Sequence, residues 1–117
     1  MKAPLTEQEE ERLEALRDYK ILDTPDEREY DDLVALASQI CDVPIALISL
    51  IDSNRQWFKA KVGLEVSETS RDISFCAHAI LNDNMLVIQD ALVDSRFATN
   101  PLVTCAPNIR FYAGMPL

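Results

Sequence analysis

Apolar side chains recur at helical spacing in the N-terminal third of the chain. Leu13 and Leu16 form a thin apolar stripe in an otherwise charged segment, and Thr6 with Glu9 has the spacing of a capping box. We therefore expect a helix from Thr6 to about residue 18, followed by a short connector.

A second capping box, with a proline at the first helical position, is expected from Thr24, Pro25 and Glu27. The next residues carry a broad apolar stripe at helical spacing, which is typical of a helix packed on a core. The stripe consists of Tyr30, Leu33, Val34, Ala37, Ile40 and Cys41. Pro44 ends this helix, because the residue before a proline avoids the helical conformation.

Two strands are expected next, joined by a turn at 52–54. Residues 45–51 are apolar on both faces, which is typical of a strand in the middle of a sheet with helices above and below it. Residues 55–62 alternate instead, which predicts a half-exposed strand. One of its faces carries Arg55, Trp57, Lys59 and Lys61. The pair forms an antiparallel hairpin that ends at Gly63.

The second half of the chain predicts short elements. They are a loop at 64–72, a short helix at 73–81 capped by Asp72 or Ser74, a strand at 85–89, a helical turn from Asp94 or Ser95 that Asn100-Pro101 closes, and a strand at 109–113. The order of helices and strands predicts the α+β class, with an antiparallel sheet that carries helices on its faces.

Composition narrows the class of protein. The 117 residues are 48% apolar and 26% charged, as in one ordinary globular domain. The longest apolar run is far shorter than the ~20 residues of a membrane-spanning helix, and the charged N-terminus does not resemble a secretory signal. We expect a cytoplasmic protein with no membrane insertion.

Negative charge is concentrated in the N-terminal arm. Residues 1–32 carry 12 acidic and 5 basic side chains, a net charge of −7, whereas residues 33–117 carry 8 and 6, a net charge of −2. Binding to a phosphate backbone needs several cations on one face. Nucleic acid is therefore not an expected partner.

Cysteine and histidine offer little metal or catalytic chemistry. The chain has three cysteines, Cys41, Cys76 and Cys105, and one histidine, His78. An odd number of cysteines without a signal peptide argues against a disulfide framework. Cys76 and His78 are two residues apart and would point away from a shared ion on a helix. We expect no metal, no cofactor and no nucleophile-base pair.

Several segments together resemble the GAF domains at the N-terminus of bacterial sensor histidine kinases and diguanylate cyclases. They are Thr24-Pro25, Val43–Asp52, Arg55–Lys59, Ser74–Ile80, Asp94–Val103 and Ile109–Gly114. The resemblance covers nearly all of residues 4–117. It implies a GAF-like, PAS-related fold, with a helix pair on one face of the sheet and a ligand cavity on the other. The expected organisation is an acidic helix and connector at 1–23 and a GAF domain at 24–117.

The resemblance implies a non-catalytic sensory module of a signal-transduction protein such as a two-component system. A small molecule in the cavity would bias a homodimer, whose signal passes to a histidine kinase or diguanylate cyclase output domain. The family also has a further strand between the first and fourth strands and then an exit helix. Neither is found among the 117 residues, so we expect a C-terminally truncated domain.

The candidate ligand contacts are Cys76, His78, Asp94, Arg96 and Phe111. Asp94 and Arg96 lie near the expected cavity mouth, where Arg96 could hold an anionic ligand. The competing interpretation, which we favour, is a helix cap and a paired or solvated arginine. Cys76 differs from the attachment cysteine of bilin-binding GAF domains, because Ala77 separates it from His78. A core cysteine is expected there.

Two other interpretations stay open. One is a dimerisation module without a ligand, which uses the acidic helix at 7–18 to lead a coiled coil. The other, less favoured, is a free methionine sulfoxide reductase that works through its cysteines. An apolar pocket with a few convergent polar groups would favour the sensor, whereas a cavity filled by the protein's own side chains would favour the dimerisation module.

Overall fold

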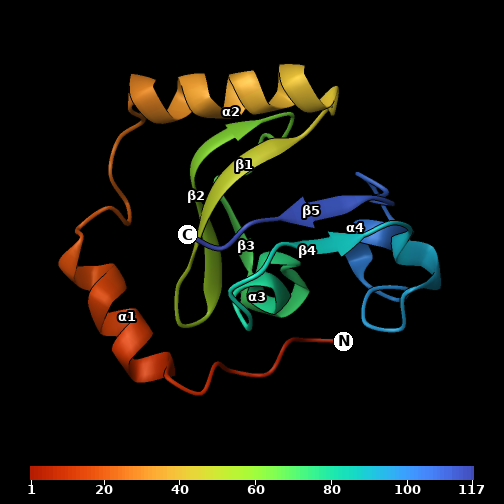
Figure 1. The fold of residues 1–117 in the computed structure, drawn as a ribbon, viewed down its shortest axis with the longest axis horizontal. Coiled ribbons are helices and arrows are strands. Elements are labelled where there is room, and N and C mark those ends of the chain that lie inside the picture. Colours follow the sequence, from red (N-terminus) through yellow and green to blue (C-terminus); the bar gives the residue numbers. More distant parts are fainter.

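The computed structural model describes residues 1–117 and contains two antiparallel sheets with helices packed around them (Figure 1). The α+β class is therefore confirmed. The helices are α1 (Glu9–Asp18), α2 (Arg28–Cys41), α3 (Cys76–Ala79) and α4 (Pro101–Thr104), with 3₁₀ turns η1 (Arg71–Ile73) and η2 (Ala91–Val93). The strands are β1 (Ala46–Ile51), β2 (Arg55–Val62), β3 (Glu68–Ser70), β4 (Leu86–Ile88) and β5 (Tyr112–Gly114). None of the helices has the length and hydropathy needed to cross a bilayer.

The predicted hairpin is confirmed, but its position in the sheet is not. β1 and β2 pair antiparallel from Ala46 opposite Val62 to Ile51 opposite Gln56. β3 pairs with the other side of β2, so the strand order is β1-β2-β3 and β2 is the central strand. The prediction that residues 45–51 lie mid-sheet is wrong. β1 is an edge strand because only β2 pairs with it, and the segment at 64–72, expected to be a loop, supplies β3 on the other side of β2.

The two-sided apolar pattern of β1 instead reflects what covers its faces. α2 and α3 both contact β1, and its residues are half-buried up to the buried Ile51. Helices thus screen the strand although its outer edge has no strand partner. Coverage of its two faces accounts for the apolar pattern of β1, although β1 is an edge strand.

The half-exposed strand predicted at 55–62 is also wrong. Every residue from Gln56 to Ala60 is buried. The pairing shifts between Ile48 opposite Ala60 and Ser49 opposite Phe58, which leaves Lys59 as the extra residue of a β-bulge. A bulge interrupts the alternation of faces, so a period of two along the sequence does not describe this strand.

Both capping boxes are replaced by other contacts. α1 begins at Glu9 after Gln8, and the Thr6 hydroxyl donates a hydrogen bond to the Glu9 carboxylate at 2.8 Å. α2 begins at Arg28, so Thr24 and Pro25 stay outside the helix. The end of α2 agrees with the prediction: Asp42 adopts a left-handed conformation, with φ 52°, and stops the helix.

Ion pairs and hydrogen bonds tie the N-terminal arm to the hairpin and to η1. The Glu9 carboxylate accepts hydrogen bonds from Arg12 and Arg71, and Arg12 also donates to the Ile51 carbonyl at 2.6 Å. The Lys59 ammonium, only 1% exposed, contacts the connector. Its partners are the Thr24 hydroxyl, the Pro25 carbonyl and the Glu27 carboxylate, each at 2.7 Å.

The apolar stripe of α2 does not enter the core as predicted. Val34 is its only buried residue, whereas Leu33, Ile40 and Cys41 are exposed. α2 thus contacts β1 and β2 along a narrower face than the pattern indicates.

The second half of the chain packs around a small aromatic core. Phe75 stacks on Phe97 with ring centroids 4.2 Å apart, and Tyr112 lies 5.2 Å from Phe75. The buried residues of this cluster are Phe75, Ile88, Ala91, Phe97 and Val103. Side chains of the protein therefore fill the interior of this half of the domain.

The short elements around this core differ in detail from the prediction. Asn100 accepts a hydrogen bond from the Leu102 N–H and begins α4 with Pro101, where the sequence predicts the end of a helical turn. The last strand is Tyr112–Gly114, shorter and later than the predicted 109–113. β4 and β5 pair with each other and form a sheet of their own.

Candidate functional site

The short helix α3 lies below β1 and beside β4 (Figure 1), and it carries two of the candidate residues. Ser74, which is one of the two predicted caps, fixes the start of α3. The Ser74 hydroxyl accepts the Ala77 N–H at 3.1 Å and donates to the Gln56 side chain at 2.9 Å. This cap ties α3 to the central strand. Cys76 and His78 then point to different surroundings, as their spacing predicts.

One group of polar and aromatic side chains gathers on the His78 side of α3, and we call it the Arg96 cluster. It consists of Met1, His78, Asp94, Arg96 and Phe97. Arg96 donates to Asp94 from Nη2 at 2.8 Å and from Nε at 3.1 Å, a two-pronged contact. The guanidinium carbon also lies 5.3 Å from the centre of the Phe97 ring.

The ion pair in the Arg96 cluster is only partly shielded. The side chains of Arg96 and Asp94 are 38% and 21% exposed. Hydrogen bonds from Arg96 lower the pKa of Asp94, and the Asp94 carboxylate raises the pKa of Arg96. Nε and Nη2 make the contacts to Asp94, which leaves Nη1 free of protein acceptors. A planar guanidinium with a free N–H edge is suited to a carboxylate or phosphate oxygen.

His78 is buried beside this ion pair. Its ring meets the Phe97 ring edge-on at 4.7 Å, and Nε2 lies 3.2 Å from the Met1 carbonyl. Burial lowers the pKa of His78, and the charge of Arg96 acts in the same direction. Both effects favour the neutral imidazole, and the His78 ring packs against the cluster.

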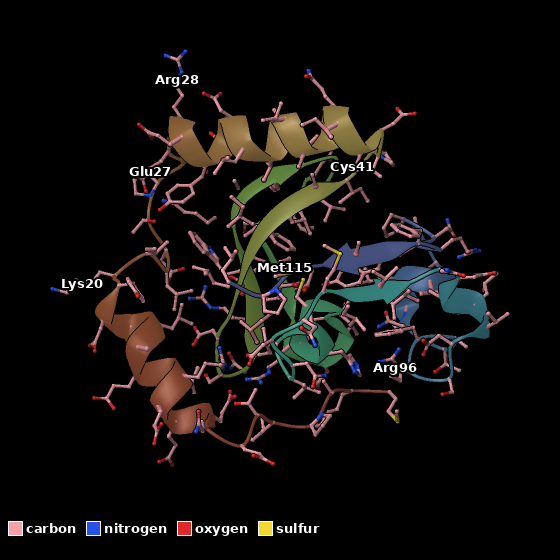
Figure 2. The ribbon with its side chains drawn as sticks, viewed as in Figure 1. Lys20, Glu27, Arg28, Cys41, Arg96 and Met115 are labelled. Atoms are coloured by element: carbon pink, nitrogen blue, oxygen red, sulfur yellow. The ribbon has the colours of Figure 1, made fainter.

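The N-terminal segment completes the cluster, which the sequence did not predict. The Met1 amino group donates to the Arg96 carbonyl at 3.1 Å. Figure 2 shows Arg96 on the loop beside this segment. Contacts between residues 95 positions apart leave no local pattern, so only the structure reveals them. The sequence also did not identify Phe97 as a site residue, because nothing in its local pattern distinguishes it from an ordinary core aromatic.

Cys76 lies apart from the Arg96 cluster. Its sulfur accepts a hydrogen bond from the Tyr112 hydroxyl at 3.2 Å. Burial raises the pKa of the Cys76 thiol, so the nucleophilic thiolate is disfavoured. Burial likewise raises the pKa of Tyr112. The contacts of Cys76 are therefore those of a thiol packed against other side chains.

The five candidate residues are thus divided among three places. His78, Asp94 and Arg96 meet in the Arg96 cluster, Cys76 contacts Tyr112, and Phe111 is 56% exposed just before β5. A surface hollow of about 300 Å³ is formed by residues 5–11 at the start of α1, and none of the five candidate residues lines it. No group of three or more His, Cys, Asp or Glu side chains is placed to hold a metal ion.

Comparison with known proteins identifies two similarities. The family model for the GAF domain matches residues 27–117. A cyclic di-GMP phosphodiesterase from Pseudomonas aeruginosa is 41% identical over 114 residues, which are 97% of this chain and 19% of the relative. The chain therefore spans about a fifth of the length of that enzyme.

Proposed function

Because the chain belongs to the GAF domain family, we propose that it is a non-catalytic regulatory module that senses a small molecule and controls the output of a bacterial signalling protein in the cytoplasm. The observation that carries this proposal is the similarity to a phosphodiesterase of which the matched segment is only 19%. Such a segment is suited to regulating catalysis that takes place elsewhere in the enzyme.

We extend the proposal to the output. The relative acts on cyclic di-GMP, which favours an output that makes or degrades this nucleotide, as a diguanylate cyclase or a phosphodiesterase does. The sequence resemblance to the GAF domains of sensor histidine kinases also implies a histidine kinase output. That output has less support from this relative.

Arg96 is paired with Asp94, as the favoured interpretation expects, and Asp94 also accepts the Arg96 backbone N–H. We propose that the Arg96 cluster is nevertheless the ligand site, and that the ligand is a small anion. The free Nη1 edge of Arg96 supplies donors, and the buried Phe97 ring packs near the guanidinium and helps to position it. Arg96 keeps 38% of its side chain exposed, so a ligand can reach it. An anion bound here would compete with Asp94 for the guanidinium.

Occupancy of this site can reach the rest of the domain through direct contacts. Phe97 is fully buried and stacks on Phe75, which contacts Tyr112 of β5. The Arg96 carbonyl also holds the Met1 amino group, at the start of the arm that leads to α1. A shift of Arg96 would therefore change the contacts of both the aromatic core and the N-terminal arm.

Native mass spectrometry of freshly purified protein tests the ligand proposal. We expect a retained small anion that is lost in Arg96→Ala, because its main charged contact is removed. Arg28→Ala is the matched control, since Arg28 is an exposed arginine that forms an ion pair on α2. Equal retention by the Arg96→Ala variant would contradict the assignment of the site.

Absence of catalysis is supported by the state of the two reactive groups. The raised pKa of Cys76 and the lowered pKa of His78 leave no activated thiolate-imidazole pair. An assay for free methionine sulfoxide with a dithiol reductant should show no turnover. Turnover that is lost in Cys76→Ser would overturn the non-catalytic proposal.

A second candidate function is a homodimerisation module without a ligand. The aromatic core favours it, since Phe75, Phe97 and Tyr112 pack against one another and fill the interior of this half of the domain. Light scattering coupled to size exclusion, read together with native mass spectrometry for a retained ligand, distinguishes the two. A dimer that retains no small molecule would support this second candidate, whereas a monomer would exclude it.

A further inference from the structure

The first eight residues form a strap between the start of α1 and the Arg96 cluster. Residues 1–8 contain no helix or strand. In Figure 1 they run below α3, from α1 toward the loop on which Figure 2 labels Arg96. The GAF family model matches residues 27–117, so this segment lies outside the matched domain. We call residues 1–8 the N-terminal strap.

Met1 holds one end of the N-terminal strap. Its amino group donates a hydrogen bond to the Arg96 carbonyl at 3.1 Å, and its carbonyl lies 3.2 Å from Nε2 of His78. Both contacts use backbone atoms, and the Met1 side chain itself is 65% exposed. This end of the strap therefore lies against the Arg96 cluster and covers the Nε2 edge of the His78 ring.

Glu9, the first residue of α1, holds the other end. Its carboxylate accepts hydrogen bonds from the Thr6 hydroxyl at 2.8 Å and from Arg71 Nη2 at 3.3 Å. The side chains of Glu9 and Arg71 are 13% and 7% exposed, so solvent screens this ion pair little. Arg71 also donates to the Asp52 carbonyl at 3.1 Å. Glu9 thus fastens the strap to η1 and to the turn of the hairpin.

Between its two ends the strap makes only weak contacts. None of its residues is buried, and Pro4 and Leu5 are exposed. Lys2 lies 3.9 Å from Asp72, but these side chains are 72% and 67% exposed, and such a surface pair contributes little. α1 has no buried residue either. Release of the strap would therefore break polar contacts at its ends without unpacking a buried residue of the strap, and segments of this kind open readily.

We propose that the N-terminal strap is a movable cover over the His78 side of the Arg96 cluster, and that the Glu9–Arg71 pair keeps it closed. Few residues separate the two ends of the strap, so each contact raises the effective concentration of the other. Loss of the Glu9 contact therefore weakens the binding of Met1 as well. This regulation rests on the proposed function, because the cover matters only if the Arg96 cluster binds a ligand.

Asp94 connects the strap to the group that would bind the ligand. Its Oδ1 accepts both the backbone N–H and Nε of Arg96, at 2.9 and 3.1 Å. The carbonyl of the same arginine holds Met1. An anion that draws the guanidinium away from Asp94 thus loosens the residue to which the strap is bound. Binding at Arg96 and opening of the strap are therefore coupled, and this coupling is reciprocal.

The titration of His78, followed by NMR, tests the cover without any ligand. His78 is the only histidine of the chain, so in a protein without a histidine tag its imidazole signals are unambiguous. Burial is the main cause that lowers the pKa of His78; the charges of Arg96 and the Met1 amino group also lower it, whereas the Met1 carbonyl and Asp94 raise it. Because burial is the largest of these effects, opening the strap should raise the pKa of His78.

A variant that lacks residues 1–5 gives the reference for the open state. It keeps every helix and strand, and none of the removed residues is buried. Thr6 remains, so its hydrogen bond to Glu9 and the Glu9–Arg71 pair are retained. We expect a higher pKa of His78 than in the wild type. An unchanged pKa would overturn the proposal, because the strap would then not cover the ring.

Two substitutions of Glu9 test the closing contact in the full chain. Glu9→Gln removes the charge that binds Arg71 and should reproduce most of the rise seen without residues 1–5. Loss of a negative charge by itself would lower the pKa of His78, so a rise reports the opening of the strap. Glu9→Asp keeps the charge at the start of α1 but shortens the side chain away from Arg71, and it should also raise the pKa of His78.

Glu11→Gln is the matched control, because Glu11 is an exposed glutamate in the same turn of α1. It should leave the titration of His78 unchanged. Circular dichroism verifies that each variant is folded over the titrated range. A folded Glu9→Gln or Glu9→Asp variant whose His78 titrates as in the wild type would overturn the proposal. Equal retention of the anion by Arg96→Ala would contradict the ligand site alone, because the titration of His78 needs no ligand.

Discussion

Buried charged residues of the hairpin and the N-terminal arm act as ties between segments far apart in the sequence. Arg71, in a segment expected to be an exposed loop, is 6% exposed and binds Glu9 across 62 positions. Arg55 holds Asp23 and Asp52 at 2.7 and 3.0 Å. Sequence alone could not predict these ties, because a long charged side chain looks the same whether it is solvated or paired. Their partners explain why a central strand can carry arginine and lysine.

Glu9 should make stability depend on pH in the acid range. Hydrogen bonds from Arg12 and Arg71 hold the pKa of Glu9 far below its ordinary value. A carboxylate with a depressed pKa in the folded state stabilises the protein above its unfolded pKa, and this contribution disappears as the pH falls toward the folded pKa. We expect Glu9→Gln to lower the free energy of unfolding at pH 7 by roughly 2 kcal/mol.

Urea unfolding of both proteins from neutral to acid pH measures this contribution. The difference between wild type and Glu9→Gln should shrink as the pH falls below about 4, where the unfolded carboxyl takes up its proton. A difference that stays constant with pH would contradict the assigned role of Glu9.

Lys59 should contribute more to the stability of the fold than its anionic partner Glu27 does. Glu27 is 53% exposed, so solvent screens its charge, whereas Lys59 is 1% exposed and also holds Thr24 and Pro25. We expect Glu27→Gln to change the free energy of unfolding by less than about 0.5 kcal/mol. Lys59→Met should loosen the connector, with faster amide hydrogen exchange at 20–27. Unchanged exchange there in Lys59→Met would show that the contacts of Lys59 do not order the connector.

At the scale of the element, patterns in the sequence predicted which segments are helical or extended better than where they pack. The β1 run was extended as expected, yet its apolar faces reflect coverage by α2 and α3, and the sheet continues from β2 to β3. In β2, the bulge at Lys59 interrupts the alternation of faces, so the predicted pattern of exposed and buried residues was wrong. For the candidate site, spacing separated Cys76 from His78 correctly, but the meeting of His78 with Arg96 depends on long-range packing.

The aromatic core should depend on Phe97. This side chain is fully buried and stacks on Phe75. Phe97→Ala should lower the free energy of unfolding by about 3–5 kcal/mol, because it removes buried surface and leaves a cavity. Phe111→Ala, at a 56% exposed phenylalanine, is the matched control and should change it by less than about 0.5 kcal/mol. Similar losses in the two variants in chemical denaturation would place the core elsewhere.

At the scale of the whole molecule, α3, the N-terminal arm and the aromatic core meet at the Arg96 cluster. Arg96 contacts the arm through Met1 and the aromatic core through Phe97. α2, on the other side of β1, carries an acidic helix face with exposed apolar residues.

The most direct test of the regulatory role places this chain in the Pseudomonas relative, in exchange for the matching segment, and measures hydrolysis of cyclic di-GMP. Exchange is reasonable because the two segments are 41% identical over 114 residues. We predict that the exchanged enzyme keeps its activity, that Arg96→Ala changes the rate severalfold, and that Arg28→Ala does not. Equal rates with and without Arg96→Ala would contradict control through the Arg96 cluster, and hydrolysis by the 117-residue chain alone would contradict a non-catalytic module.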